Sequence, residues 1–549
     1  MLLIVAAMLV QLGRVAQLKV RPEPRLMQTV GSPVSSRPEL TRRGDVLDRR
    51  GRIAATSTIG YRLFVDPQEV QDLATIAVDL ANLTGMDPVE IDRAILPRRD
   101  KRYAPIGSTL DDWQVEAVRS ANLRGVGLEP RLVRHYPQGD LAANIIGMVG
   151  FEHSGLGGLE HTHDQRLSPT NGRLTYLRDA RRRALWIEPA DYRPGQSGQS
   201  VHLSIDLVIQ GLARQRLVEA VEQYNAGGGR IVVLDCRTGE ILAMLDVLNE
   251  RPGWDEQIED PQREIDPALG RNRCVSDPYE PGSTFKPFIW AAATQLGKAK
   301  VDEVLKTPAP GSVYRTSRGR SIRDAFPYPN ATWHEALVRS LNSGMAIVAE
   351  RMTQREMRDA VLRFGFGSST RSGLPGESAG IVTDAGNWNH YTQTSVPMGQ
   401  EIAVTPLQMA RAFSAFARDG SLPPVRSTAV RPDEYEVEVV QRVLDEPIVL
   451  LAREAMRDAA RRVQPDSYDM FGKSGTAQLP RSDGRGYHED RYVSGFVAGA
   501  PLQEPRIVVV CVIDDPDKSI GHYGGTVAGP VVRDVVEQTL TYLGVQPTK

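Results

Sequence analysis

The sequence predicts a multidomain α+β protein whose C-terminal part is an antiparallel sheet flanked by helices. Three observations support this. The 549 residues exceed what one ordinary core can organise. From residue 195 onward, strand patterns are followed by a long helical stretch, further strands and a last helix. The first twelve residues are almost wholly apolar, and a segment rich in Pro, Ser and Arg separates them from the remainder.

The composition is that of a globular protein, with 41% hydrophobic and 24% charged residues. The formal net charge of -2 argues against a nucleic-acid-binding protein, which would carry a basic surface. Only nine lysines occur, so most of the positive charge is arginine. Any chemistry that requires a lysine therefore has few candidates.

The three cysteines, Cys236, Cys274 and Cys511, include no pair with C-x-x-C spacing. Neither a disulfide framework nor a zinc site is therefore indicated. Cys236 and Cys511 each follow an apolar run typical of a buried strand, so we expect them to be small buried residues.

Residues 1–20 are interpreted as a membrane anchor or the truncated end of one, and residues 21–40 as a linker. The apolar run is about 18 Å long as a helix, whereas a span needs about 20 residues. No basic start or small-x-small cleavage site of a signal peptide is present. The run is either the end of an anchor that starts upstream, a short span to Leu18 with Arg14 at the interface, or a soluble core segment. No later segment is apolar enough to span, so the remainder would lie on one side of a membrane.

A mixed, β-rich domain is predicted over residues 41–194. A strand pattern at 45–48 leads into a turn at 49–51, and residues 67–95 have the periodicity of two amphipathic helices. Four arginines between Arg178 and Arg183 are typical of a solvated surface run.

A second domain is predicted over residues 195–545. Residues 283–420 have a helical pattern, which predicts a helical subdomain inserted between the first and last strands. The other predicted elements are a strand at 201–205, a helix at 207–224, a hairpin from 230–236 and 240–245, strands at 472–478, 492–500 and 506–513, and a helix at 531–543.

The segment from Glu280 to Phe288 is the most informative in the chain. Gly282 allows a turn into an apolar helix, which places Ser283 at the helix N-terminus and Lys286 one turn later on the same face. A serine hydroxyl needs a base to become a nucleophile, and a lysine serves only if its pKa is lowered by burial or a nearby cation. Alone, S-x-x-K is equally consistent with a capping serine and a surface lysine.

Two later motifs complete a constellation. Ser340-Leu341-Asn342 lies between two helical patterns, and Lys473-Ser474-Gly475-Thr476 lies on a predicted strand. The order S-x-x-K, S-x-N, K-[ST]-G is the signature of the penicillin-binding and serine β-lactamase superfamily. Two of the nine lysines occupy the two lysine positions of this signature.

The chain resembles class B penicillin-binding proteins, which are monofunctional peptidoglycan D,D-transpeptidases. This implies that residues 41–194 are the pedestal, of the dimerisation type, and residues 195–545 the transpeptidase domain. The segments that carry the resemblance beyond the three motifs are Arg43 to Gly51, Tyr136 to Gly139, Gly155 to Glu160, Leu203 to Asp206 with Gln210, Val404 to Gln408, and Tyr523 to Gly525 with Ala528 and Pro530.

Two departures from the superfamily pattern are present. Leu341 stands where the β-lactamases have Asp, which favours a transpeptidase, and Ser474 replaces the common Thr. No glycosyltransferase domain is found, because pedestal motifs occupy residues 20–195, and no appendage domain follows the last helix.

The resemblance implies a mechanism on a D-Ala-D-Ala stem-peptide donor. Lys286 accepts the proton of Ser283, which attacks the penultimate carbonyl, and the backbone N–H groups of Ser283 and Thr476 form the oxyanion hole. Ser340 relays a proton to the leaving nitrogen. Asn342 binds the donor amide and orients Lys286. The remaining roles implied are positive potential from Lys473 and substrate binding by Ser474, Gly475 and Thr476.

The same resemblance implies no metal or organic cofactor, covalent inhibition by β-lactams, and an inner-membrane protein with its catalytic domain on the periplasmic side. The ending from Tyr523 to Pro530 is most similar to the septal, cell-division type. The implied partners are a polytopic glycosyltransferase and other division proteins.

Two alternatives stay open. One is a β-lactamase or a β-lactam-sensing receptor on the same fold, although a hydrolase needs no pedestal. The other is a non-catalytic scaffold, although all three motifs are intact. His334, His488 and His522 are expected on the surface or rim, and Trp388 either lines the cleft or belongs to the core.

Overall fold

The computed structural model describes residues 2–20, 34–150, 153–178, 184–187, 192–249, 271–430, 441–481 and 486–549. Within them the chain divides into two compact units whose segments alternate along the sequence. Unit 1 comprises residues 1–44, 57–133 and 167–199, and unit 2 comprises residues 45–56, 134–166 and 200–549.

Unit 1 combines a small helical layer with short sheets. Its elements are α1 (Leu2–Val20), β1 (Val34–Glu39), α3 (Leu73–Thr84), α4 (Pro88–Ile95), η1 (Leu96–Arg98), β4 (Ala104–Leu110), α5 (Asp112–Ala121), β6 (Gly172–Arg178) and β7 (Ala184–Ile187), together with most of β3 (Ile53–Val65) and β5 (Val126–His135). β1, β6 and β7 form an antiparallel sheet in that order, so the predicted linker ends in a strand. Residues 21–33 of that linker lie outside the described residues.

The two helices predicted over residues 67–95 are confirmed as α3 and α4. Asp72 and Asp87 cap them, each accepting a hydrogen bond from the backbone N–H two residues later. Their apolar faces pack with β3, β4 and α5 into one core, in which Leu63, Leu80 and Ile91 are fully buried. This amphipathic packing explains the periodicity seen in the sequence.

The apolar N-terminus forms α1, which contains Arg14 and Lys19. None of the helices that the structure describes is long and apolar enough to cross a membrane.

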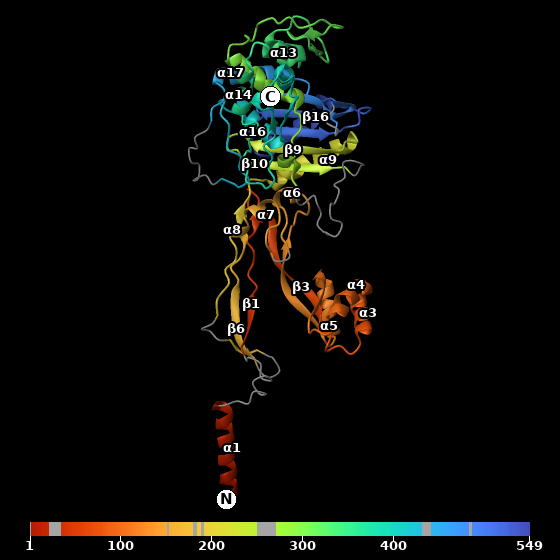
Figure 1. Ribbon diagram of the computed structural model, residues 1–549, viewed down its shortest axis with the longest axis vertical. Coiled ribbons are helices and arrows are strands. Elements are labelled where there is room, and N and C mark those ends of the chain that lie inside the picture. The colour runs from red at the N-terminus through yellow and green to blue at the C-terminus, as the bar shows by residue number, and fades with distance from the viewer. Residues whose placement is uncertain are drawn as a thin grey trace. The chain divides into compact units, whose positions relative to one another are not determined.

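Unit 2 is built on a five-stranded antiparallel sheet of order β10-β9-β17-β16-β15. Strands from the two ends of the unit's sequence thus lie side by side (Figure 1). The strands are β2 (Val46–Leu47), β8 (Val201–His202), β9 (Gly228–Asp235), β10 (Ile241–Leu248), β11 (Tyr314–Arg315), β12 (Ser321–Ile322), β13 (Ile381–Val382), β14 (Ile402–Ala403), β15 (Phe471–Pro480), β16 (Tyr487–Ala500) and β17 (Ile507–Asp514).

Helices cover both faces of this sheet, and every residue of β9 and β17 is buried. α9 and α19 share one core with Val233, Val509 and Cys511. Because successive strand residues point to opposite faces, Val508 and Val510 face the other layer, where α16 packs across β9, β16 and β17. The helices of unit 2 are α6 (Ala143–Ile146), α7 (Gly158–Thr162), α8 (Asp164–Leu167, at the boundary), α9 (Leu207–Gln223), α10 (Arg273–Ser276), η4 (Gly282–Phe285), α11 (Lys286–Gln295), α12 (Trp333–Val338), α13 (Asn342–Ala349), α14 (Gln354–Arg363), η5 (Ala385–Asn387), α15 (His390–Ser395), η6 (Val396–Met398), α16 (Pro406–Ala417), α17 (Glu446–Ala459), α18 (Gly524–Val527) and α19 (Gly529–Tyr542).

Residues 45–56 and 134–166, predicted as part of the first domain, pack with unit 2. Buried polar contacts account for this. Asp48 is fully buried and accepts hydrogen bonds from Arg52 and from the backbone N–H of Leu207. Arg52 also pairs with buried Asp206 at 2.5 Å, so the start of α9 is tied to the turn at 48–52.

All three cysteines are free and buried in unit 2, as expected for small apolar residues. Burial raises the pKa of the Cys236 thiol to about 12, so it stays protonated at neutral pH.

Candidate active site

Ser283 lies in the 3₁₀ turn η4, directly before α11, rather than in the first turn of the helix itself. Gly282 has a φ of +54°, a conformation that glycine adopts without strain, and its N–H donates to the carbonyl of Gly399 at 3.0 Å. Ser283 is half-buried, and its neighbours Gly282 and Thr284 are buried. The hydrogen bond to Gly399 therefore fixes the backbone of the turn, while the Ser283 side chain stays partly exposed.

Lys286 is the first residue of α11 and is fully buried. Its ammonium nitrogen donates to the Ser340 carbonyl at 2.6 Å, to Ser340 Oγ at 3.2 Å and to Asn342 Oδ1 at 2.8 Å. Burial lowers the pKa of Lys286 well below its ordinary value, nearby Lys473 lowers it further, and Asp324 raises it. These are the conditions under which a lysine can act as a base.

Ser340 and Asn342 lie where α12 gives way to α13, as predicted. Ser340 has a φ of +60°, which few residues other than glycine adopt. Asn342 begins α13, and its Nδ2 donates to the carbonyl of Arg323 at 3.0 Å. Because that carbonyl can only accept, the amide is oriented with its oxygen toward Lys286.

The third motif lies on β15, which packs directly on the serine turn. A side chain at Gly475 would meet the Pro281 carbonyl at 2.6 Å and Thr284 at 2.9 Å, so only glycine fits. Lys473 is buried and donates to the carbonyl of Ser474 at 3.0 Å. Burial lowers the pKa of Lys473 to about 7.

Thr476 is half-buried on the same strand, and its hydroxyl oxygen accepts from the backbone N–H of Gly524 at 2.9 Å. Gly524 must be glycine, because a Cβ there would lie 2.1 Å from the Gly475 carbonyl. Since one lone pair of Thr476 is occupied by this donor, its own O–H is directed elsewhere as a donor.

The predicted site residues thus lie close together, but they differ in their exposure to solvent. Both lysines are buried, whereas Ser283, Ser340, Asn342, Ser474 and Thr476 are half-buried. Among the described residues, neither Ser283 Oγ nor Ser474 Oγ makes a hydrogen bond. Both hydroxyls are therefore unengaged, and hydrogen bonds of reacting groups often tighten only when substrate is bound.

Sequence reasoning missed Asp324. Its carboxylate accepts from the backbone N–H of Ser343 at 2.9 Å and from the Ser343 hydroxyl at 2.5 Å, and so holds the first turn of α13. No local sequence signal marks it, since it lies on a loop sixteen positions before Ser340.

The other polar candidates lie where expected or are now placed. His334 is on the surface, with its Nε2 3.2 Å from Asp458. His488 is half-buried, as is His522, which stacks between the rings of Tyr492 and Tyr523. Trp388, left open between cleft and core, is a core residue, 6% exposed.

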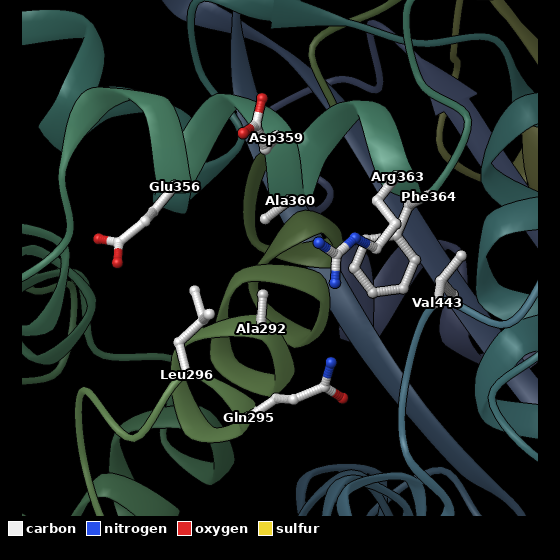
Figure 2. Close-up of a pocket in the computed structure, with 9 residues that line it drawn as sticks. All are labelled: Ala292, Gln295, Leu296, Glu356, Asp359, Ala360, Arg363, Phe364 and Val443. Atoms are coloured by element: carbon white, nitrogen blue, oxygen red, sulfur yellow. The ribbon is translucent and has the colours of Figure 1, made fainter.

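A small cavity of about 100 Å³ lies at the other end of α11 from Lys286, between α11 and α14 (Figure 2). Figure 2 shows Glu356, Asp359 and Arg363 among the residues that line it, together with Ala292 and Phe364. None of the predicted site residues lines it.

Two family models match this chain. Residues 229–537 match the penicillin binding protein transpeptidase domain, and residues 38–203 match the penicillin-binding protein dimerisation domain. Among curated relatives, the probable peptidoglycan D,D-transpeptidase PenA of Neisseria gonorrhoeae is 32% identical over 97% of this chain and 88% of its own length. The peptidoglycan D,D-transpeptidase FtsI of Escherichia coli K12 is 30% identical over 99% of this chain and 91% of its own length.

Solved structures give the same result. A peptidoglycan synthetase from Bifidobacterium adolescentis aligns with a TM-score of 0.69 and 25% identity, over 94% of this chain and 98% of its own. Penicillin binding protein 3 from Mycobacterium tuberculosis, in complex with aztreonam, aligns with a TM-score of 0.68 at the same identity and coverage.

Proposed function

The chain belongs to the class B penicillin-binding proteins and is a peptidoglycan D,D-transpeptidase, and from this premise we propose that it works through a covalent acyl-enzyme on Ser283. The observation that carries this proposal is the convergence of Lys286 Nζ on Ser340 and Asn342, one turn from the Ser283 hydroxyl. A buried lysine with a lowered pKa supplies the base that a serine nucleophile needs.

In the acylation step, neutral Lys286 takes the proton of Ser283 Oγ, and the oxygen attacks the penultimate D-Ala carbonyl of the donor peptide. The N–H groups of Ser283 and Thr476 stabilise the oxyanion. When the C–N bond breaks, Ser340 passes a proton from Lys286 to the leaving nitrogen, and D-Ala departs as the free amino acid. Lys286 is then neutral again.

The donor's terminal carboxylate is bound by the β15 edge. The Thr476 hydroxyl is directed as a donor because its oxygen already accepts from Gly524, and the Ser474 hydroxyl makes no hydrogen bond to the residues that the structure describes. Lys473 supplies positive potential, since an arriving carboxylate favours its ammonium form. Asn342 binds the donor amide and keeps Lys286 in place.

In the second step, an amine of a neighbouring stem peptide attacks the ester carbonyl of the acyl-enzyme. The amide bond of the crosslink forms, the Ser283 ester bond breaks, and the proton lost by the amine returns to Ser283 Oγ through Lys286. β-Lactams, whose amide carbonyl mimics the donor, acylate Ser283 in the same way.

Incubation with a fluorescent penicillin tests this function. The wild-type protein should retain one covalent label for hours, and Ser283→Ala should retain none. Rapid release of hydrolysed penicillin would instead identify a β-lactamase, and equal labelling of Ser283→Ala would refute the site.

We further propose a septal role, with residues 41–194 as pedestal and 195–545 as transpeptidase domain. The similarity to FtsI supports the septal role. Depletion of the protein should produce filaments, whereas round cells would indicate an elongation role.

The apolar run Met1 to Leu12 supports attachment of residues 1–20 to the inner membrane. The catalytic unit would then lie in the periplasm, beside a polytopic glycosyltransferase. An alkaline carbonate wash of the membrane fraction should leave the chain bound.

A further inference from the structure

Glu280 lies three residues before Ser283 and joins three segments through one oxygen atom. Its Oε1 accepts the backbone N–H of Glu401 at 2.9 Å and the hydroxyl of Tyr487 at 3.0 Å. Glu401 precedes β14, and Tyr487 begins β16. The mechanism described above gives Glu280 no role, although its side chain is half-buried next to the serine turn.

Two of the joined segments position the backbone N–H groups that are proposed to form the oxyanion hole. Ser283 N–H comes from η4, whereas Thr476 N–H comes from β15, the partner of β16. Tyr487 pairs with Pro480, four residues beyond Thr476 on the same strand. A bond from Glu280 to Tyr487 therefore fixes the outer end of the β15–β16 hairpin against the turn that carries the nucleophile.

The contact to Glu401 is built at a conformational cost. Glu401 has a φ of +56°, a conformation that is strained for a residue with a side chain. The Thr392 hydroxyl donates to its carboxylate at 2.9 Å, and its backbone N–H donates to Glu280. Such strain persists only where the surrounding contacts determine the backbone.

The second oxygen of Glu280 lies in a less polar environment than the first. Oε2 is buried and has no hydrogen-bond partner among the described residues, which disfavours a carboxylate there. Burial raises the pKa of Glu280, the N–H of Glu401 and the Tyr487 hydroxyl oppose this, and the Glu401 carboxylate raises it further. Glutamine is accordingly the closest mimic of the side chain.

We propose that Glu280 is a positioning residue for the acylation step, which holds the β15–β16 hairpin at the distance from η4 that the two oxyanion N–H groups require. This proposal rests on the proposed function. Glu280 does not touch the reacting atoms; it acts through Tyr487 and the Glu401 backbone. The accepting oxygen Oε1 is the part of the side chain that matters, because both hydrogen bonds are made to it.

The test compares Glu280→Gln, Glu280→Ala and Tyr487→Phe in the full chain. Stopped-flow acylation by a fluorescent penicillin separates the acylation rate constant from initial binding, and thermal unfolding is followed in parallel. Glu280→Gln should acylate within about threefold of wild type. Glu280→Ala should lose roughly 10- to 100-fold in the rate constant, because displacements near 1 Å have effects of this order. Initial binding should be little changed.

Tyr487→Phe should be intermediate, and the double variant Glu280→Ala/Tyr487→Phe should be no slower than Glu280→Ala, since both remove the same bond. Glu356→Ala is the matched control: this carboxylate caps α14 through the Thr353 N–H, so its loss should lower the unfolding temperature without slowing acylation.

A wild-type rate for Glu280→Ala would overturn the proposal, as would an equal loss in Glu280→Gln and Glu280→Ala. Failure of the wild-type protein to be labelled would instead refute the proposed function.

Discussion

The side-chain nitrogen of Lys286 lies 2.6 Å from the backbone carbonyl oxygen of Ser340, closer than to either side-chain oxygen that it contacts. Ser340 itself has a φ of +60°, a conformation that is strained for a residue with a side chain. One strained residue thus provides both a backbone acceptor that fixes the base and a hydroxyl that can relay its proton.

These two contributions of Ser340 can be separated. Ser340→Gly keeps the carbonyl and tolerates the positive φ, so the free energy of unfolding should change by less than about 1 kcal/mol. Loss of the hydroxyl should slow penicillin acylation by roughly 10²- to 10⁴-fold. Ser340→Val should in addition lower the unfolding free energy by about 1–2 kcal/mol. Urea unfolding and acylation kinetics measure both, and a wild-type acylation rate in Ser340→Gly would exclude the relay.

The pH dependence of acylation should reveal the charges around Lys286. The rate should rise with pH as Lys286 loses its proton, with a midpoint well below the ordinary lysine pKa because burial lowers it. Asp324 raises the pKa of Lys286, so Asp324→Asn should move the midpoint to lower pH. Lys473 lowers the pKa of Lys286, so Lys473→Met should move it to higher pH.

The measurement is the acylation rate constant across pH for each variant. Shifts of both variants in one direction would contradict the assignment of Lys286 as the base.

Gly475 should tolerate no side chain. Gly475→Ala places a methyl group 2.6 Å from the Pro281 carbonyl, so β15 must move away from the serine turn. We expect a loss of about 1–3 kcal/mol in unfolding free energy and at least a ~10-fold slower acylation. Gly525→Ala is the control, because its Cβ would approach nothing closer than 3.8 Å. Equal unfolding free energies and equal acylation rates in the two variants would show that the close approach of Gly475 to Pro281 is unimportant.

Buried ion pairs below the site should contribute to stability as a network. Asp514 contacts Arg230 at 2.5 Å and Arg273 at 3.5 Å, and all three side chains are less than 8% exposed. Asp514→Asn removes the charged partner of buried Arg230, whereas Arg273 keeps Asp246 at 3.0 Å, and the variant should lose about 3–5 kcal/mol of unfolding free energy. Asp359→Asn is the surface control. Asp359 is 53% exposed and its partner Arg355 is 91% exposed, so this variant should lose less than about 1 kcal/mol of unfolding free energy. Urea denaturation measures the unfolding free energy of both variants. Similar losses in the two variants would contradict this account.

The residues proposed as catalytic could be named from the sequence because the chemistry demands them in fixed local patterns. Ser283 with Lys286, and Ser340 with Asn342, are each separated by less than one helical turn, so spacing alone brings them together. Strand and helix positions in unit 2 also followed from periodicity, as β9, β17 and α9 show.

Residues that act across the fold could not be found in this way. Asp324 reaches the site through a contact with Ser343 that no sequence spacing encodes. Gly524 belongs to a segment that carries the family resemblance, but its contact with Thr476 is likewise not encoded by spacing. The grouping of residues 45–56 with unit 2 likewise depends on Asp48 meeting Leu207, more than 150 positions away.

The central claim is that Ser283 carries the acyl group, and mass spectrometry of the proteolysed protein tests it most directly. After incubation with a stem pentapeptide ending in D-Ala-D-Ala and rapid acid quench, the peptide that contains Ser283 should gain the mass of the donor minus one D-Ala, and Ser283→Ala should show no adduct. An adduct on another peptide, or one that persists in Ser283→Ala, would contradict the account.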